Sequence, residues 1–273
     1  MLGVDLCRVL SRNNEVIGLD IGEMDITSWD EVMSILPGLQ PDIVLHAAAF
    51  TDVDGCEQKP EKAFLINGTG TANIVSACER IGCKLAYLST DFVFSGGKEG
   101  LYIEEDKPEP VNIYGESKLA GEKEAAKLKN SFIIRTAWLY GKSGRNFVTA
   151  ILEEARARKV LRVVDDQAGS PTYTVDLSEM LARVIESASF GIYHISNEGS
   201  CSRFDFAMEI LKSANISGVE IIPIKSSELT SPAKRPVNSS LGNFRLKHEG
   251  FGDMRRWELA LAEFLQTVEC IQK

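Results

Sequence analysis

A tyrosine and a lysine four positions apart, Tyr114 and Lys118, are the residues of this sequence best suited to proton transfer. On a helix, this spacing puts both side chains on one face, about one turn apart. A free phenol has a pKa of about 10, and a fixed ammonium nearby lowers that pKa. Lowering it by roughly three units takes about 4 kcal/mol, which one close charge in a partly dry site supplies. The pair therefore has the chemistry to protonate a carbonyl oxygen or to deprotonate an alcohol.

The pattern Y-x-x-x-K also arises on ordinary surface helices, so the elements around it decide its meaning. Up to about residue 150, apolar strand patterns alternate with helix patterns, which predicts a doubly wound, Rossmann-like parallel sheet. The stretch 43–49 is apolar throughout, as in a strand that is buried on both faces. The strands expected in this part are 15–20, 43–49, 84–89 and 131–136, and the helices are 1–10, 29–36, 67–78 and one that begins near 113.

The remainder of the chain is less regular and predicts a smaller C-terminal α/β lobe that packs on the sheet and shares a cleft with it. Its expected helices are 146–158, 175–187, 203–214 and 256–268, and its expected strands are 161–164, 191–195 and 219–224.

The N-terminal segment has the pattern of the second half of a nucleotide-binding β-α-β unit. A helix at 1–10 precedes a strand that ends in Asp20, and in such units this acid bonds the adenosine ribose. The first strand and its glycine-rich turn would lie before Met1, and only Gly3 could belong to that turn. We expect a misplaced start or a truncated chain, the alternative being a protein that truly begins with a helix. A chain of this length should bind a dinucleotide poorly, because that turn normally holds the pyrophosphate.

Composition excludes several classes of function. The net charge of −9 argues against a nucleic-acid partner, which requires a basic face. No apolar run approaches the roughly 20 residues of a membrane helix, and the first residues lack the pattern of a signal peptide. We therefore expect a cytoplasmic protein. The six cysteines contain no C-x-x-C pair and the three histidines lie far apart, which favours reduced thiols and no metal site.

Polar side chains follow the expected strand at 84–89. Thr90 and Asp91 stand at its carboxyl end, which is where open α/β sheets bind ligands. The small alanines at 47–49 end another strand, where they either leave room for a ligand or simply pack. His46, beside them, is expected to be a satisfied core or cleft residue.

Together these motifs resemble the extended short-chain dehydrogenase/reductases and, within them, the dTDP-4-dehydrorhamnose reductase family. The resemblance covers essentially the whole chain except the missing start. The two later motifs are the more specific ones, because they recur in this subfamily and not across the superfamily. The matching stretches are 46–54, 89–96, 114–118, 135–138, then Asp166-Gln167 with Gly169, Pro171 and Thr172, and Arg235-Pro236 with Asn238, Ser239 and Leu241.

The resemblance implies reduction of the C4 ketone of dTDP-4-dehydro-L-rhamnose to dTDP-L-rhamnose, in nucleotide-sugar and cell-surface polysaccharide biosynthesis. It makes Tyr114 the proton donor and Thr90 a hydroxyl that bonds the same oxygen. Lys118 is then expected to hold the nicotinamide ribose and to lower the pKa of Tyr114. The implied substrate contacts are Thr90, Asp91, Trp138, Arg235 and Asn238.

Within that set, Arg235 and Asn238 are expected to face the diphosphate, since an arginine fork suits paired anionic oxygens. The alternative for Arg235 is a surface ion pair. Phe92 stands where the family commonly has tyrosine, which removes one hydroxyl near the sugar.

The implied cofactor is NADPH, with NADH also open. A carboxylate at Asp20 favours the free ribose hydroxyls of NADH, whereas the family uses NADPH and often NADH too. Residues 1–150 would form the NAD(P)-binding domain and 151–273 the substrate-binding lobe, in a chain that forms homodimers as the family does. The cofactor contacts implied by position are Leu2, Gly3, Asp20, Asp25, Ile26, Ala47, Ala48, Ala49, Thr51, Asn67, Tyr114 and Lys118.

Two other functions remain open on the sequence. One is another nucleotide-sugar ketoreductase or epimerase of the same superfamily, which the motifs barely separate from the first. The other is a non-catalytic regulatory subunit, as in the relative that serves methionine adenosyltransferase. The complete set of Thr90, Tyr114 and Lys118 argues against this last reading, because a pure binding module has no need of it.

Overall fold

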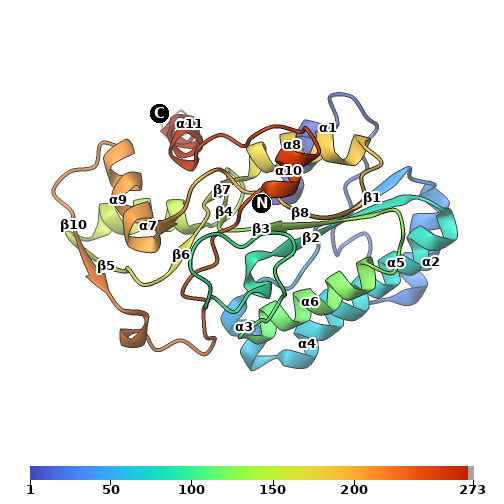
Figure 1. The fold of residues 1–273 in the computed structure, drawn as a ribbon, viewed down its shortest axis with the longest axis horizontal. Helices are drawn as coiled ribbons and strands as arrows, with labels where there is room; N and C mark the ends of the chain where they lie inside the picture. The colour runs from blue at the N-terminus through green and yellow to red at the C-terminus, as the bar shows by residue number, and fades with distance from the viewer. Residues whose placement is uncertain (270–273) are drawn as a thin grey trace.

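A computed structural model describes residues 1–269, and its centre is a four-stranded parallel sheet in the order β1-β2-β3-β8 (Figure 1). All three neighbouring pairs run parallel, and the register sets His46 opposite Tyr87 and Thr90 opposite Thr136. This sheet confirms the predicted Rossmann-like α/β fold. The strands are β1 Ile43–His46, β2 Lys84–Thr90, β3 Ser131–Thr136 and β8 Gly191–His194.

Helices cover both faces of the sheet (Figure 1). Because side chains alternate along a strand, Ala86 and Leu88 pack towards α1 and α8, whereas Leu85 and Tyr87 pack towards α2 and α5. The strands are apolar on both sides for this reason. The helices of one face are α1 Leu2–Leu10, α8 Thr174–Glu186 and α10 Phe244–His248, and those of the other are α2 Trp29–Leu39, α3 Val53–Gln58, α4 Pro60–Phe64, α5 Thr71–Ile81 and α6 Ile113–Ala125.

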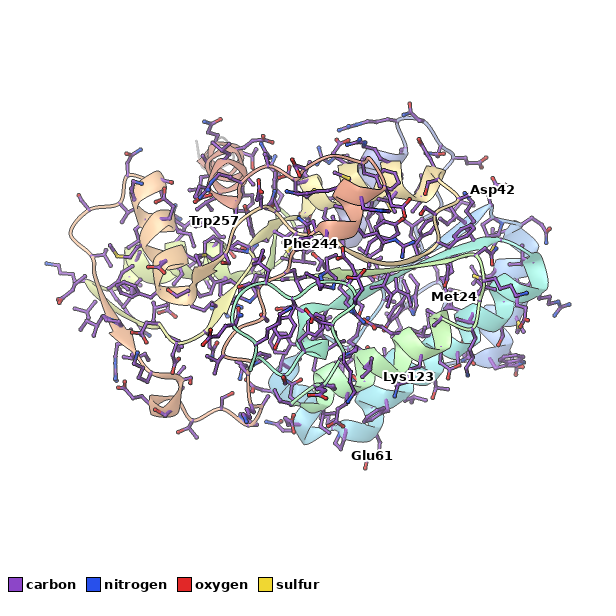
Figure 2. All side chains as sticks on the ribbon, viewed as in Figure 1. Met24, Asp42, Glu61, Lys123, Phe244 and Trp257 are labelled. Carbon is purple, nitrogen blue, oxygen red and sulfur yellow. The ribbon has the colours of Figure 1, made fainter. Side chains whose placement is uncertain are left out.

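The second part of the chain builds a lobe beside the carboxyl ends of the strands (Figure 1). Its core joins α7, α9 and α11 around buried aromatic side chains that include Trp257, labelled in Figure 2. Three two-stranded pairs, β5 with β10, β4 with β7 and β6 with β9, complete it. The elements are β4 Leu139–Tyr140, α7 Phe147–Ala157, β5 Val160–Val164, β6 Ala168–Gly169, β7 Thr172–Tyr173, β9 Cys201–Ser202, α9 Arg203–Ser213, β10 Glu220–Ile224 and α11 Trp257–Glu269.

The chain does not stay in the lobe after residue 150. Helix α8 returns to cover the sheet and β8 joins it as its last strand. Thr174, at the start of α8, donates a hydrogen bond of 2.6 Å to Asp5 of α1, and both side chains are buried. Residues on both sides of the predicted boundary therefore build the central sheet.

One predicted strand is wrong. Within the described residues, 15–20 pair with no other strand, and β1 is the edge of the sheet. A strand persists only where a neighbour takes up its backbone N–H and C=O groups, and this segment has none. The strand predicted at 43–49 also ends early, at His46, and the helix predicted from 67 is preceded by a π-helical turn over Leu65–Gly70.

Most other predicted helices and strands occur within a few residues of their expected bounds. Among residues 1–269, no helix is long and apolar enough to cross a membrane, and no group of three acidic, histidine or cysteine side chains is arranged to hold a metal ion. Five of the six cysteines are free thiols, while Cys270 lies outside the described residues.

Candidate active site

Helix α6 carries the tyrosine and the lysine, and its first turn fixes their position. Asn112 caps the helix: its side-chain oxygen accepts from the Gly115 N–H at 2.8 Å, and its amide donates to the Lys234 carbonyl, also at 2.8 Å. At Gly115 a Cβ would lie 2.1 Å from the Phe92 carbonyl oxygen. Only glycine allows this approach, which brings Tyr114 against the segment that follows β2.

Tyr114 and Thr90 lie together at the carboxyl end of β2. The Thr90 hydroxyl lies near enough to the Tyr114 phenol to oppose the rise in its pKa, and the Tyr114 ring meets the Phe92 ring edge-on with centroids 5.6 Å apart. The Thr90 hydroxyl also donates to Asp91 at 2.9 Å and accepts from the Phe92 N–H at 3.2 Å. The structure thus brings together the tyrosine and the threonine that the sequence paired.

Lys118 is buried one turn along the same helix. Its Nζ donates to the Leu88 carbonyl at 2.6 Å and lies 4.2 Å from the centre of the Tyr87 ring. Burial lowers the pKa of Lys118 to about 7, against the opposing charge of Glu122. Within residues 1–269, no carboxylate pairs with the Lys118 ammonium to oppose this shift directly.

The expected effect of Lys118 on the tyrosine is not what this structure shows. Burial raises the pKa of Tyr114, the Thr90 hydrogen bond opposes that rise, and the charge of Asp91 adds to it. Lys118 is not among the groups that act on this pKa, since its ammonium is held at the Leu88 carbonyl. In this arrangement Tyr114 is protonated at neutral pH.

Asn67 fixes the loop after β1 against α6. Its carboxamide donates to Ser117 Oγ at 2.9 Å and to the Phe50 carbonyl at 3.1 Å, and it accepts from the Phe50 N–H at 2.8 Å. His46 is buried beneath this loop and shares a 3.1 Å hydrogen bond with Thr71. Burial, followed by the charge of Lys118, lowers the pKa of His46 to about 3. His46 is a satisfied core residue, as predicted.

The residues implied for a dinucleotide cofactor fit it best at the nicotinamide end. There the Lys118 ammonium and the Tyr114 and Thr90 hydroxyls are buried or half-buried, beside the small residues Ala47–Ala49 that follow β1. Ala48 and Thr51 are exposed, so the backbone is accessible at this edge. A ribose with two hydroxyls suits such a donor set.

The residues implied for the adenosine end are more scattered. Asp20 is exposed and bonds the Ile21 N–H at 2.8 Å, whereas Asp25 accepts from the N–H and the hydroxyl of Thr27. Ile26 packs in the core below α2. Leu2 and Gly3 begin α1, and nothing lies within 4 Å of a Cβ built at Gly3. Their contact with a cofactor remains a prediction.

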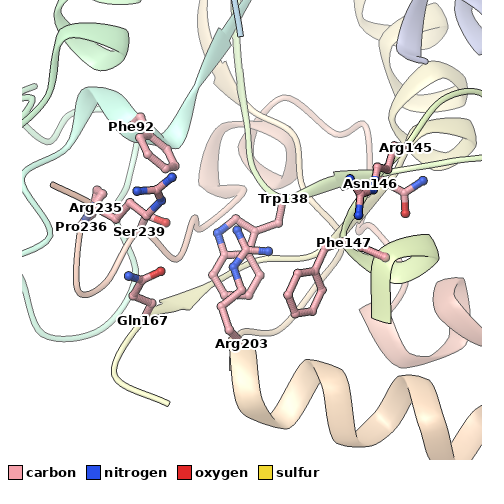
Figure 3. A pocket seen from close by; sticks show the side chains of 11 residues that line it. Phe92, Trp138, Arg145, Asn146, Phe147, Gln167, Arg203, Arg235, Pro236 and Ser239 are labelled. Atoms are coloured by element: carbon pink, nitrogen blue, oxygen red, sulfur yellow. The ribbon is translucent and has the colours of Figure 1, made fainter. Parts of the chain in front are cut away.

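A cavity of about 470 Å³ opens between the central sheet and the lobe, within the size range of small-molecule sites (Figure 3). Its wall combines aromatic rings with three arginines, which is a lining suited to an anion that carries a ring. The lining residues are Phe92, Trp138, Arg145, Asn146, Phe147, Ala150, Gln167, Arg203, Arg235, Pro236 and Ser239.

Asp91 and Ser239 link the Thr90 hydroxyl to this cavity. Ser239, in the cavity wall, donates to Asp91 at 2.5 Å, and Asp91 in turn accepts from Thr90. Burial raises the pKa of Asp91 to about 6, while these two hydrogen bonds and the charge of Arg203 oppose the rise. Phe92, which touches Tyr114, lines the same cavity. Two residues of the cavity wall are therefore connected to the neighbourhood of Thr90 and Tyr114: Ser239 through Asp91, and Phe92 through its ring.

Arg235 forms the ion pair that the sequence offered as one alternative, and it also stands in the cavity wall. It lines the cavity, and it also pairs with Asp54, whose carboxylate lies 2.9 Å from its terminal nitrogen. It donates further to Ser231 and to the Ala233 carbonyl. The hydrogen bond from Arg235 is the largest of the effects that lower the pKa of Asp54 to about 2. Most of the donors of Arg235 are thus engaged within the protein.

Asn238 does not line the cavity. Its side-chain nitrogen donates to the carbonyls of Lys98 and Gly100 at 2.9 and 2.7 Å, and its oxygen accepts from the Ser240 N–H at 3.1 Å. The carboxamide thereby fastens two loops to each other. The neighbouring Ser239 faces the cavity instead.

Trp138 stands in the cavity wall with a strained backbone. Its φ of 45° is left-handed, which is rare for an aromatic residue and costs of order 1–3 kcal/mol. A Cβ at Gly169 would lie 2.2 Å from the indole, so the glycine makes room for the ring. Arg203 stacks on the indole, with its guanidinium carbon 3.5 Å from the ring centre. These contacts stabilise the strained backbone conformation of Trp138, in which the indole lines the cavity.

The family model described as RmlD substrate binding domain matches residues 1–270. The chain belongs to this family. It is 41% identical to the spore coat polysaccharide biosynthesis protein SpsK of Bacillus subtilis, over 97% of this chain and 93% of the relative. It is 37% identical to the dTDP-4-dehydrorhamnose reductase of Aggregatibacter actinomycetemcomitans, over 95% and 93%.

Solved structures agree with this assignment to the RmlD family. The dTDP-4-dehydrorhamnose reductase of Bacillus anthracis, crystallised with NADP, superposes with a TM-score of 0.92 at 38% identity, over 96% of this chain and 95% of that one. The orthologue from Clostridium acetobutylicum superposes with a TM-score of 0.95 at 36% identity, over 98% and 96%.

Of the residues predicted for the site of this RmlD-family protein, Thr90, Asp91 and Tyr114 meet at one point, and Trp138 and Arg235 line the adjoining cavity. Sequence reasoning missed the other two arginines and Phe147: Phe147 and Arg203 are the first residues of α7 and α9, and Arg145 precedes the cap of α7. The caps Asn146 and Ser202 were visible in the sequence, but nothing in it indicated that both helix starts face one cavity. The missed lining residues with charged or aromatic side chains are Arg145, Phe147 and Arg203.

Proposed function

We propose that this protein reduces the C4 ketone of dTDP-4-dehydro-L-rhamnose to dTDP-L-rhamnose with NADPH. One observation carries the proposal: the Thr90 and Tyr114 hydroxyls, with Lys118 one turn along the helix, adjoin a cationic, aromatic-walled cavity. Relatives named dTDP-4-dehydrorhamnose reductase at 36–38% identity support it, and the NADP complex of one of them supports the cofactor. The reaction would take place in the cytoplasm, and the protein would act as a homodimer.

Tyr114 is the proton donor in this proposal. Its raised pKa keeps the phenol protonated at neutral pH, which is the form needed to protonate the oxygen of a ketone undergoing reduction. Thr90 would stabilise the charge that develops on the same oxygen by turning its hydroxyl, which donates to Asp91 here, towards the bound ketone. NADPH, when bound, would supply the hydride for C4. The proton lost by Tyr114 ends on O4 of the product, so the alkoxide leaves as an alcohol.

Lys118, one turn along α6 from Tyr114, contributes to the same step. With its pKa lowered to about 7, Lys118 would bond ribose hydroxyls once its Nζ leaves the Leu88 carbonyl. The hydrogen bond from Ser239 holds the Asp91 carboxylate to which Thr90 donates, and so keeps Thr90 in place at the end of β2. The aromatic rings of the cavity exclude water from this end of the ligand.

The test follows absorbance at 340 nm while the purified protein is mixed with NADPH and enzymatically prepared dTDP-4-dehydro-L-rhamnose. We expect NADPH oxidation that depends on the sugar and yields dTDP-L-rhamnose by mass spectrometry and chromatography against a standard. Absence of oxidation, with NADPH binding demonstrated separately, would overturn the proposal and favour a regulatory role.

A second candidate is reduction of a related dTDP-4-keto sugar. It is favoured by the 31% identity to the dTDP-4-keto-6-deoxy-D-glucose reductase of Streptomyces niveus, over 96% of this chain. The same assay with dTDP-4-keto-6-deoxy-D-glucose separates the two candidates by their kcat/KM. A ratio above one in favour of that sugar would replace the first substrate with the second.

A further inference from the structure

Arg203 is the least engaged of the three arginines in the cavity wall. Its guanidinium stacks against Trp138, with the carbon 3.5 Å from the ring centre, and lies 4.9 Å from the centre of the Phe147 ring (Figure 3). A stacked guanidinium keeps its N–H donors around the rim, in the plane of the group. These donors are therefore available along the cavity wall.

Within residues 1–269, the Arg203 guanidinium makes no hydrogen bond and no ion pair. Arg235, by contrast, spends its donors on Asp54, Ser231 and the Ala233 carbonyl. Arg145 is exposed and lies 3.8 Å from Glu153. A half-buried arginine without a partner costs desolvation energy, which an anionic ligand in the cavity offsets.

Arg203 remains charged in this position. Burial lowers its pKa to about 10, the charge of Asp91 opposes that shift, and the charge of Arg235 adds to it. At neutral pH the group is thus a full cation. It faces a space with a second cation, Arg235, on the opposite side (Figure 3). Two cations that line one cavity of this size suit the two negatively charged phosphate groups of a diphosphate.

The backbone holds Arg203 in place before any ligand binds. Ser202 caps α9, accepting from the Asp205 N–H at 2.9 Å, and the Arg203 N–H donates to the Gln167 carbonyl at 3.1 Å. The β6–β9 pair also sets Gly169 opposite Cys201, and Gly169 touches the indole of Trp138. One small element therefore positions both the arginine and the ring on which it stacks, so little order is lost on binding.

We propose that Arg203 is the principal anion-binding residue of the cavity and contacts the diphosphate of the nucleotide-sugar substrate. Arg235 is then a positioning residue, which holds the 231–236 loop to Asp54. It contributes to anion binding mainly through its positive charge. This inference rests on the proposed function, because it assigns the diphosphate of that substrate. The sequence motifs pointed to Arg235 and did not include Arg203.

The test measures binding of dTDP, thymidine and inorganic pyrophosphate by isothermal titration calorimetry to the wild-type protein and its variants. Charge-assisted hydrogen bonds contribute about 1.5–3 kcal/mol, so Arg203→Gln should weaken dTDP binding roughly 10- to 150-fold. Thymidine, which has no phosphate, should bind both proteins equally. Arg203→Lys should recover only part of the loss, since an ammonium neither forks nor stacks as a guanidinium does.

Two further variants complete the design. Arg158→Gln, at the exposed end of α7, removes a positive charge outside the cavity and should leave dTDP affinity within about twofold of wild type. Arg235→Gln should weaken dTDP less than Arg203→Gln does. In steady-state assays, Arg203→Gln should raise KM far more than it lowers kcat. Circular dichroism checks that each variant is folded.

Several outcomes would overturn the inference: equal losses for dTDP and thymidine, a larger diphosphate-specific loss in Arg235→Gln, or wild-type protein that binds neither dTDP nor pyrophosphate. The first would mean that Arg203 merely supports Trp138. If the wild type prefers UDP or GDP to dTDP and Arg203→Gln still loses that ligand selectively, the assignment of Arg203 stands and the thymidine nucleotide of the proposed function fails.

Discussion

Replacing Glu122 with glutamine should destabilise the protein strongly, because it leaves a buried arginine without its counter-charge. Arg135 of β3 donates to the two oxygens of Glu122 on α6 at 2.9 and 2.7 Å, and the side chains are only 1% and 5% exposed. Ser89 of β2 donates to the same carboxylate at 2.5 Å. This carboxylate therefore connects α6 to two strands of the sheet, β2 and β3.

The magnitude follows from the cost of an unpaired charge in the interior. Removing one partner of a buried pair costs about 3–5 kcal/mol, because the remaining ion keeps its desolvation penalty. At this chain length each kcal/mol lowers Tm by about 2 °C, so Glu122→Gln should lower Tm by roughly 6–10 °C. Loss of the carboxylate also lowers the pKa of Lys118 further, since Glu122 is the charge that opposes its burial.

The measurement is urea denaturation followed by circular dichroism, with thermal melts alongside it. Glu124→Gln is the matched control, because Glu124 lies on the same helix and pairs with Lys127 at the surface, where a pair is worth about 0.2–1 kcal/mol. Combining Glu122→Gln with Arg135→Met removes the stranded charge and should recover part of the loss. A loss for Glu122→Gln no larger than for Glu124→Gln would refute the reasoning.

Three further outcomes are expected. Gly169→Ala places a Cβ 2.2 Å from the Trp138 indole, and overpacking of about 1–3 kcal/mol should raise the substrate KM about tenfold in steady-state kinetics. Burial raises the pKa of Asp91 from 3.8 to about 6, so the stabilising effect of this carboxyl is complete below pH 3.8 and is lost as pH rises through 6. The free energy of unfolding, measured by urea denaturation at several pH values, should therefore fall by about 3 kcal/mol over this range in the wild type and not in Asp91→Asn. Asp54→Asn should change stability by less than about 1 kcal/mol, because the pair is partly exposed, yet make the loop at Arg235 more sensitive to limited proteolysis.

The sequence indicated the sheet well because its central strands are apolar on both faces. β2 and β3 fall close to their expected bounds, since Leu85–Leu88 and Phe132–Ile134 pack against helices on either side. The segment 15–20 has the same local pattern and forms no strand. Pairing depends on a neighbour in space, and a local pattern carries no information about that neighbour.

The site divides in the same way. Thr90 was predictable as a ligand-facing residue from its place at the end of a strand, and Tyr114 from its spacing to Lys118, whereas their pairing came from the resemblance to the reductase family. Arg203 was not, because only the β6–β9 pairing brings the start of α9 to the cavity. Asn238 shows the converse: the motif contains it, but its carboxamide is used to join two loops.

The central claim is that Tyr114 gives its proton to the ketone oxygen, and Tyr114→Phe tests it most directly. The variant keeps the ring that packs on Phe92 and loses only the hydroxyl. General acid catalysis contributes about 10²–10⁴-fold, so kcat for dTDP-4-dehydro-L-rhamnose reduction should fall by that factor while NADPH affinity stays within about twofold. A Tyr114→Phe enzyme that retains kcat within about threefold of wild type would contradict the account.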